Sequence, residues 1–493
     1  MWSTTSRLLG TLLAVMAPTS AVAKKKGKSR SNGKSIEKEV CVIGGGAAGA
    51  YTAYEVQKRG YDTVLFEPQS DLGGNCEILE FPSKLTPGLN YTVNAAVIIF
   101  SPKPAVLDFF NEFDAPIGNL APGGGSGGQT FVYGPGFVIP APPSDPQVLQ
   151  DALFNFSVIV NSPPYVGIAD IPPLPDWDNL TPVQRDALLE PFGDFLARNP
   201  GVAPLRPLIS SLMQGFGFVD TRPMWELLAF GGPTFLTQLF TGTFLTLQEG
   251  CQSIYDELAQ RMLTEDPDSI KLNTWVDKVD RRKGMADVTL RATGPDGSKT
   301  NYRCDNAIVA FRPNGIDKSF LKDITCEEQT FFDDLGYNGY IPSVWEMDLG
   351  PSLLEIGADQ STSLRFSFFQ PVDVGIITLS KDRPEADYPW RLFYQPSEPA
   401  DTPAKLEAVK AQIISDLTAL GFVRIKNLFF SNHVYAVKPQ SEANTLQWTR
   451  FFNDANTDDD HLFWTGSVPA GEGSENVWSY SRDLINDNFP PKH

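Results

Sequence analysis

Histidine is scarce in this sequence, since only three of the 493 residues are histidine and His493 is the last of them. The shortage excludes a metal site built on histidine, and we expect no metal ion. His433 and His461 are expected to be structural. A hydrolase is not expected either, because Gly124-x-Ser126-x-Gly128 matches a nucleophile elbow only in its letters. It lies in a glycine run without the flanking strand and helix that this motif requires.

Cysteine is equally scarce, and the five cysteines lie far apart in the sequence. Their spacing excludes a dense disulfide scaffold and shows no zinc pattern. Because five is an odd number, at least one thiol is free or paired between chains. For Cys76 we expect an ordinary buried thiol rather than a covalent or redox group. The positions are Cys41, Cys76, Cys251, Cys304 and Cys326.

Long apolar runs are also missing. The run at 8–17 is about half of the ~20 residues that a helix needs to cross a bilayer. With Arg7 before it and Ala21-Val22-Ala23 after it, residues 1–23 have the pattern of a secretory signal peptide, and a retained signal anchor is the alternative. No later run is long enough to span a membrane. We therefore expect a secreted, soluble mature protein.

Positive charge is in deficit, since 40 Lys and Arg residues are set against 59 Asp and Glu residues. Seven of the basic residues and none of the acidic ones lie in 1–35, so residues 36–493 carry a net charge of −26. Such an acidic body repels nucleic acid, and we expect no nucleic-acid partner. The basic run 24–35 is expected to be a solvated linker, with a contact to a polyanion as the alternative. Three sequons favour a secretory route, with N-glycans possible at Asn90, Asn155 and Asn179.

What the sequence does contain is a β–α–β unit that begins near residue 36. A strand is expected at 37–43, a helix at 50–59 and a second strand at 61–66. The motif Gly44-x-Gly46-x-x-Gly49 lies between the first strand and the helix, which is the context that a dinucleotide-binding turn requires. The three glycines allow a tight turn, close approach of a pyrophosphate, and packing of helix on strand.

Two further features of this unit favour a bound nucleotide. Free N–H groups at the start of the helix, together with the positive end of the helix dipole, attract phosphate, and Ala47 and Ala48 of the glycine turn are expected cofactor contacts. Glu67 ends the second strand, where its carboxylate can accept hydrogen bonds from an adenosine ribose and disfavours the 2′-phosphate of NADP. A simple tight turn is the weaker alternative.

A second glycine pair follows in Asp71-Leu72-Gly73-Gly74-Asn75. In this segment the sequence resembles the flavin-containing amine-oxidase superfamily, whose members carry a similar doublet, typically Leu-Gly-Gly-Arg, that closes over the cofactor. Asn75 stands where those proteins have arginine. The resemblance implies that Gly73, Gly74 and Asn75 lie at the cofactor.

Three later segments extend this resemblance. Residues 250–280 look like the family's helix and adenine-contacting strand, with Val276 as the contact residue, and 305–313 looks like the strand that returns to the cofactor. Residues 461–478 resemble the terminal strand, turn and helix that cap the flavin. In that segment the resemblance implies cofactor contacts at Gly466, Glu475, Asn476 and Val477. Because NAD-dependent dehydrogenases usually lack a terminal cofactor strand, the predicted cofactor is FAD.

A closer resemblance links two segments to a fungal and algal branch of this superfamily, which includes β-cyclopiazonate dehydrogenase and the polyenoic fatty-acid isomerases. The segments are 191–195 (Pro-Phe-Gly-Asp-Phe) and 466–481. Monoamine oxidases tie the flavin to a cysteine shortly before the terminal motif. No cysteine follows Cys326, so that covalent link is not expected here.

No catalytic residue can be named from the sequence, because the flavin itself carries the difficult step. Glu472 and Glu475 flank the terminal turn, where they could bind ribityl hydroxyls or cap the helix. Trp478 and Tyr480 could form an aromatic wall at the ring or a core face.

We predict an α/β fold with a discontinuous Rossmann-type FAD-binding domain and a second, substrate domain of mixed sheet and helices. The predicted reaction is hydride transfer from a small organic substrate, a secondary metabolite, an amine or a lipid, with oxygen as the expected acceptor. The alternatives are a redox-neutral fatty-acid double-bond isomerase and a non-catalytic flavin-binding protein. The FAD-binding domain is predicted at 36–100, 246–330 and 451–493, and the substrate domain at 101–245 and 331–450.

Overall fold

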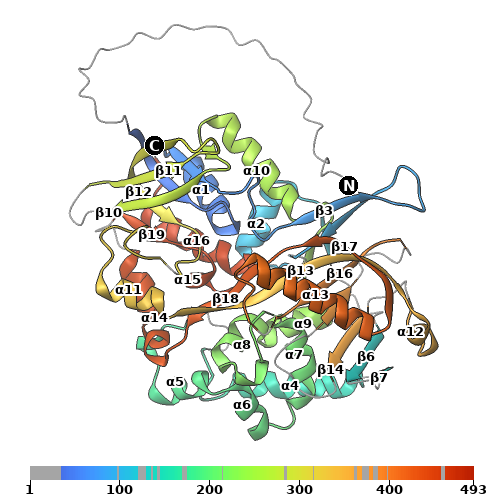
Figure 1. Ribbon diagram of the computed structural model, residues 1–493. Coiled ribbons are helices and arrows are strands. Elements are labelled where there is room, and N and C mark those ends of the chain that lie inside the picture. The colour runs from blue at the N-terminus through green and yellow to red at the C-terminus, as the bar shows by residue number, and fades with distance from the viewer. Residues whose placement is uncertain are drawn as a thin grey trace, which may run out of the picture. The chain divides into compact units, whose positions relative to one another are not determined.

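A computed structural model gives the structure of most of the chain after the basic linker (Figure 1). The predicted signal peptide, nearly all of the linker and the Gly124–Gly128 motif lie outside the described residues. The structure describes residues 35–96, 99–119, 129–134, 137–140, 145–168, 175–213, 215–281, 286–314, 316–359, 364–368, 377–380, 387–396, 398–456 and 461–492.

The first sheet is built from strands of three separate chain segments. Strand β1 (Ile36–Ile43) pairs in parallel with β2 (Thr63–Phe66) and with β12 (Lys299–Val309). At the sheet's parallel edges, β2 pairs with β9 (Ile270–Lys271), and the end of β12 pairs with β19 (Leu462–Trp464). The antiparallel strands β10 (Trp275–Arg281) and β11 (Val288–Thr293) extend the sheet beyond the first half of β12.

Both faces of this parallel sheet are buried, which explains its nearly continuous apolar strands. Val40, Val42 and Leu65 face one apolar core, whereas Cys41 and Ile43 face another, as the two-residue period of a strand requires. The first of these cores is covered by four helices, which are α1 (Ala47–Lys58), α2 (Pro104–Glu112), α10 (Gln252–Glu265) and α16 (Ser474–Asn488).

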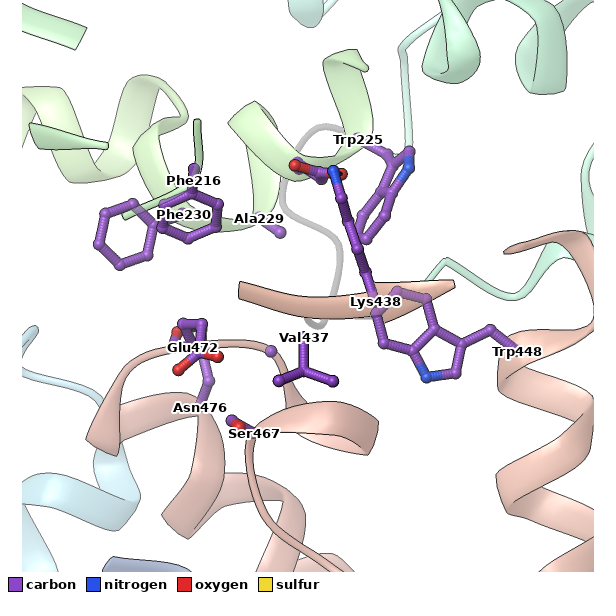
Figure 2. Close-up of a pocket in the computed structure, with 12 residues that line it drawn as sticks. Phe216, Trp225, Ala229, Phe230, Val437, Lys438, Trp448, Ser467, Glu472 and Asn476 are labelled. Carbon is purple, nitrogen blue, oxygen red and sulfur yellow. Dashed lines mark hydrogen bonds and ion pairs between the residues drawn. The ribbon is translucent and has the colours of Figure 1, made fainter. Parts of the chain in front are cut away.

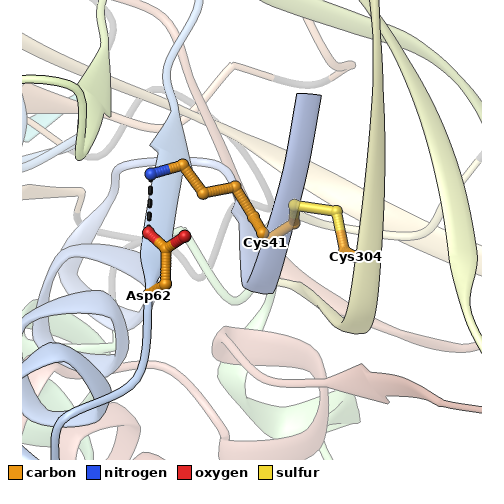
Figure 3. Close-up of a disulfide and its surroundings, with 4 residues drawn as sticks. Cys41, Asp62 and Cys304 are labelled. Carbon is orange, nitrogen blue, oxygen red and sulfur yellow. Dashed lines mark hydrogen bonds and ion pairs between the residues drawn. A yellow bond between two sulfur atoms is a disulfide. The ribbon is translucent and has the colours of Figure 1, made fainter. Parts of the chain in front are cut away.

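A disulfide joins the neighbouring strands β1 and β12 within the second core (Figure 3). Cys41 and Cys304 are both fully buried, and their Cα atoms lie 5.9 Å apart. Cys76 and Cys251 are buried free thiols, and Cys326 is an exposed one. Cys76 is buried, as the sequence analysis predicted.

The second sheet runs in the order β17-β13-β16-β15-β14-β6-β7, and β18 pairs with the first half of the long strand β13. Helix α13 (Pro403–Ala419) packs on the face that carries Ile341 and Trp345. Two of these strands, β6 and β7, lie where the sequence predicted only loops and helices. The strands are β6 (Gln129–Gly134), β7 (Phe137–Pro140), β13 (Leu335–Leu349), β14 (Leu364–Phe368), β15 (Ile377–Ser380), β16 (Trp390–Tyr394), β17 (Phe422–Phe430) and β18 (His433–Pro439).

Most of the remaining elements are helices that pack beside the two sheets. The division into two domains stays a prediction. Helix α2, which lies in the predicted substrate domain, packs through Phe109 and Phe110 against Trp478 of α16, which lies in the predicted FAD-binding domain. The other elements are β3 (Ile78–Pro82), β4 (Asn90–Asn94), β5 (Ile117–Asn119), α4 (Pro146–Val160), α5 (Pro182–Leu189), α6 (Phe192–Arg198), α7 (Arg206–Leu212), α8 (Met224–Gly231), α9 (Pro233–Thr241), β8 (Leu245–Leu247), α11 (Cys326–Asp333), α12 (Pro351–Glu355), α14 (Glu442–Ala455) and α15 (Ser467–Ala470), with short 3-10 turns at Trp177–Asn179, Ala203–Leu205 and Val219–Thr221.

A buried ion pair holds α11 against the first sheet. Both terminal nitrogens of Arg281 donate to the carboxylate of Glu328 at 2.8 Å, and the backbone N–H of Thr325 donates to the same group. Burial by itself raises the pKa of Glu328, but these hydrogen bonds outweigh it and hold the pKa below its usual value.

We expect Glu328→Gln to lower the free energy of unfolding at pH 7 by about 3 kcal/mol, because it removes the carboxylate charge that faces the buried guanidinium of Arg281. Since the folded-state pKa is depressed, this difference from the wild type should be present above the ordinary carboxyl pKa and shrink as pH falls below it. Denaturant unfolding at several pH values measures it. Asp401→Asn, in an exposed pair with Lys405, is the control and should cost less than about 1 kcal/mol. An equal loss in both variants would contradict the prediction.

Candidate cofactor and substrate site

The glycine turn connects β1 to α1 at the carboxyl end of the parallel strands. Gly44 has a positive φ of 101°, and its N–H donates to the carbonyl of Phe66 at 2.8 Å. Helix α1 begins at Ala47 with Gly46 as its N-cap residue, and no side chain caps it. The first N–H groups of α1, at Ala47 and Ala48, are therefore available to a ligand, and a helix N-terminus favours an anion.

The last two glycines of the motif have different roles. A Cβ atom added to Gly49 would lie 1.7 Å from the carbonyl oxygen of Gly44, so this glycine lets helix and strand pack. A Cβ atom on Gly46 would have only the Cα atom of Gly74 within 4 Å, at 3.9 Å. The space beside Gly46 is therefore open, as a bound pyrophosphate requires.

The glycine doublet lies directly against this turn. The N–H of Gly73 donates to the carbonyl of Gly45 at 2.8 Å, and Gly46 and Gly73 form a parallel bridge. Both Gly73 and Gly74 have positive φ, which favours glycine over residues with side chains. Asn75 follows them and keeps part of its surface exposed. The structure thus brings the two predicted glycine segments together.

Glu67 supports the turn as well as facing the site. Its side chain is 7% exposed, and its two oxygens accept the N–H groups of Gly45 at 2.6 Å and of Gln69 at 2.8 Å. Burial raises the pKa of Glu67, and these two hydrogen bonds oppose the rise. Each oxygen keeps a lone pair for a further donor such as a ribose hydroxyl. The N–H of Thr274 donates to the carbonyl of Glu67, which places the start of β10, with Val276, beside this acid.

The terminal segment meets the same turn from the other side. Gly44 and Gly466 both lie close to the carbonyl oxygen of Ala310. A Cβ atom added to Gly44 would be 3.3 Å from this oxygen, and one added to Gly466 would be 3.6 Å from it. The indole nitrogen of Trp478 donates to the carbonyl of Ala47 at 3.2 Å, and Figure 1 shows α16 beside α1. The Trp478 ring stacks on Phe100 within the core, so it belongs to a core face rather than to an aromatic wall.

The start of α16 carries the other predicted contacts. Gly473 is the N-cap and has no side chain with which to cap the helix, and Glu475 lies in the first turn. Glu475 is 8% exposed, and burial raises its pKa. Asn476 accepts a hydrogen bond from Lys103 at 2.5 Å, a residue that the sequence analysis missed. Val477 is buried in the core beneath this turn.

A pocket opens beside this terminal turn (Figure 2). Four of its lining residues, Ser467, Gly471, Glu472 and Asn476, come from the terminal segment. The opposite wall is mainly apolar. Its residues are Phe216, Trp225, Ala229, Phe230, Val437 and Trp448, together with the charged pair Glu226 and Lys438.

Glu226 and Lys438 form a buried ion pair at this wall. Lys438 extends from β18 toward α8, and its ammonium donates to Glu226 at 2.5 Å (Figure 2). Arg222 lies 3.7 Å from the other carboxylate oxygen. Burial raises the pKa of Glu226 to about 7, whereas Arg222 lowers it, and the Lys438 ammonium also favours the charged form. Two cations thus surround one carboxylate.

Aromatic side chains of the second sheet continue the wall. Tyr435 packs on Phe216 with ring centroids 5.4 Å apart, and Tyr340 lies 5.0 Å from Tyr435. Burial raises the pKa of both tyrosines, although each keeps part of its surface accessible. No local sequence pattern marked these residues, because they come from strands of unremarkable composition.

The remaining residues singled out from the sequence have structural partners. His433 lies 2.9 Å from a carboxylate oxygen of Glu77, and His461 lies 3.2 Å from the side-chain oxygen of Asn306. The hydroxyl of Tyr480 accepts a hydrogen bond from Asn456. Among the described residues, no three His, Cys, Asp or Glu side chains are grouped as a metal site would require. Nor does the described part of the chain include a helix with the length and apolarity to cross a membrane.

The chain has an amine-oxidase-like fold built on a Rossmann-type turn. Residues 42–113 match the family described as an NAD(P)-binding Rossmann-like domain. The "FAD-dependent oxidoreductase dpchF" of Colletotrichum higginsianum is 23% identical over 476 residues, which cover 91% of this chain and 93% of that protein.

Two solved structures share the fold over most of their length. A "CLA-producing fatty acid isomerase from P. acnes" aligns with a TM-score of 0.70 and 16% identity, covering 92% of this chain and 99% of that one. A putrescine oxidase aligns with a TM-score of 0.65 and 15% identity, covering 92% and 98%. The predicted fold class and the resemblance to the amine-oxidase superfamily are confirmed.

The open space at Gly46 makes a direct test possible. We expect Gly46→Leu to fold but to keep less than about a tenth of the bound FAD, because the added side chain points into the cradle rather than into protein. The absorbance ratio of flavin to protein measures the retention. Its melting temperature should match that of flavin-stripped wild type. Gly49→Val is the matched variant, and its clash with Gly44 should prevent folding. Full flavin content in Gly46→Leu would contradict this placement.

Proposed function

We propose that this chain is an FAD-dependent oxidoreductase that removes a hydride from a small, largely apolar organic substrate. One observation carries the proposal: four residues of the terminal segment line the pocket, and helix α16 of the same segment contacts the glycine turn through Trp478 and Ala47. A ligand in the pocket therefore lies next to whatever the turn holds. The named relative and the solved structures that share the fold are consistent with this function.

The chain offers donors and space that fit FAD. Helix α1 and the open side of Gly46 suit the pyrophosphate, and Glu67 suits the adenosine ribose. Asn476 and the uncapped start of α16 suit the flavin end. When bound, the flavin supplies hydride acceptance, and oxygen is the acceptor that we propose for its reoxidation.

The protein's own residues bind the substrate and exclude water. The aromatic walls from Phe216, Trp225 and Tyr435 favour an apolar body. At the wall across from the terminal turn, Lys438 pairs with Glu226, and Arg222 lies 3.7 Å from the same carboxylate group. The Lys438 ammonium lines the pocket and can donate to an anionic or carbonyl oxygen of a substrate.

The same wall supports a second candidate, the redox-neutral isomerisation of a double bond in a fatty acid. A carboxylate at Lys438 would hold an apolar chain in the pocket, and the isomerase of known structure shares this fold. Turnover without any electron acceptor distinguishes this candidate from the oxidoreductase. A flavin that dithionite reduces but no candidate substrate does would instead indicate a non-catalytic flavin-binding protein.

Anaerobic flavin spectra test both the function and the substrate class. We expect a long-chain carboxylate to perturb or bleach the flavin more strongly than the matching alcohol or amine, and admission of oxygen to restore the spectrum with release of hydrogen peroxide. Lys438→Met should weaken carboxylate binding at least about tenfold without loss of flavin, because the pocket then loses its accessible ammonium. Lys405→Met, at an exposed ion pair, is the control. A folded protein that is colourless and cannot take up FAD would end the proposal.

We also propose that the protein enters the secretory pathway and is released after removal of residues 1–23. The buried disulfide Cys41–Cys304 supports an oxidising compartment, and the three sequon asparagines, Asn90, Asn155 and Asn179, are all exposed.

Expression in a eukaryotic host should yield secreted protein that begins at Lys24 and carries N-glycans. Amino-terminal sequencing and the mass lost on glycosidase treatment measure these two features. Replacing all three asparagines by glutamine should abolish the mass loss, which serves as the control. Retention of the whole chain inside the cell, without glycans, would contradict the secretory route.

A further inference from the structure

The start of α10 packs against the loop that carries the glycine doublet. The side-chain amide of Gln252 donates to the carbonyl of Leu72 at 2.8 Å, and the ring of Tyr255 occupies the place where a Cβ atom of Gly73 would be. One residue before Cys251, a Cβ atom on Gly250 would lie 2.9 Å from the side chain of Ile78. These contacts involve Leu72 and Gly73 before Cys76 and Ile78 after it, so Cys251 lies opposite Cys76.

Both cysteines are buried, and hydrogen bonds hold the backbone of each in place. Cys76 is 2% exposed and Cys251 is 1% exposed, and they belong to the same apolar core. The N–H of Cys76 donates to the carbonyl of Gly73 at 3.1 Å, and the N–H of Cys251 donates to the side chain of Asn94 at 3.0 Å. Burial raises the pKa of Cys251, and the neighbouring Cys76 thiol adds to the rise.

We propose that Cys76 and Cys251 form a second disulfide as the chain folds, and that Cys326 is the one thiol left free. Each thiol gives up one proton, a bond forms between the two sulfur atoms, and two electrons reduce the disulfide of a protein thiol oxidant to a dithiol. The inference rests on the proposed secretory route, which supplies such oxidants. The Cys41–Cys304 bridge is an equally buried disulfide in the same fold, so burial of the final bond is no obstacle.

This cross-link would act on the cofactor cradle. The doublet closes over the glycine turn through the bridge between Gly46 and Gly73, and α10 supports the doublet from beneath through Gln252 and Tyr255. A bond from Cys76 to Cys251 would tie the cradle wall to that helix. Its loss should loosen the wall and speed the release of FAD.

A count of free thiols on the secreted, full-length protein tests the proposal. The protein is unfolded in concentrated guanidinium chloride with excess N-ethylmaleimide and no reductant, and its mass is measured after removal of glycans. We expect one label, at Cys326, and none in Cys326→Ser. Three labels would show that only Cys41–Cys304 is oxidised and would overturn the proposal. Five labels would also overturn it, and would locate the failure in the secretory route rather than in the pairing.

Peptide mapping and stability complete the experiment. Digestion without reductant should yield a linked peptide pair that contains Cys76 and Cys251, and a link from either one to Cys326 would overturn the assignment. The double variant Cys76→Ala with Cys251→Ala should melt several degrees lower than wild type and lose FAD faster on dilution. Cys326→Ala is the matched control and should change neither property. If the double variant fails to fold, the number of free thiols in the wild-type protein still tests the proposal.

Discussion

The close approach of three chain segments at the end of β12 is the constraint on which this structure depends. Ala310 donates its N–H to the carbonyl of Ile43, and its own carbonyl faces both Gly44 and Gly466. Parallel pairing of β1, β12 and β19 brings the glycine turn and the terminal segment to one edge of the sheet. Any larger residue at Gly49 would push helix and strand apart there, and the cradle and the pocket would lose their common wall.

The parts of the site that could be predicted from the sequence are those set by short-range chemistry. The strand, the glycine turn, the helix and Glu67 follow one another within about thirty residues, and each has a local physical signature. The terminal turn was predicted because residues 461–478 resemble the segment that caps the flavin in the amine-oxidase superfamily. In these segments the helices and strands lie within a few residues of the predicted ones.

The residues that could not be predicted reach the site through long-range packing. Glu226, Lys438 and Tyr435 come from a helix and a strand whose local sequence resembles any buried element. The pairing of Cys41 with Cys304 depends on the register of β1 against β12, which no local pattern specifies. Strands β6 and β7 were missed because proline and glycine surround them, and these residues usually indicate loops.

Charge is distributed oppositely inside and outside the molecule. The body after residue 35 has a net charge of −26, yet the pocket wall carries two cations around one carboxylate. Interactions between exposed charges are largely screened beyond about 10 Å at 0.1 M salt, whereas buried and partly buried charges are screened much less.

A discontinuous domain also has a particular entropic problem. The first sheet is closed only when segments separated by hundreds of residues meet, and the entropy lost in closing such loops grows with their length. All five cysteines lie in the segments predicted to form this domain, and none lies in the predicted substrate domain. The Cys41–Cys304 bridge joins the first strand to β12 across 263 residues. A cross-link at this place removes open conformations from the unfolded chain, and so it stabilises the sheet edge that holds both the glycine turn and the terminal segment.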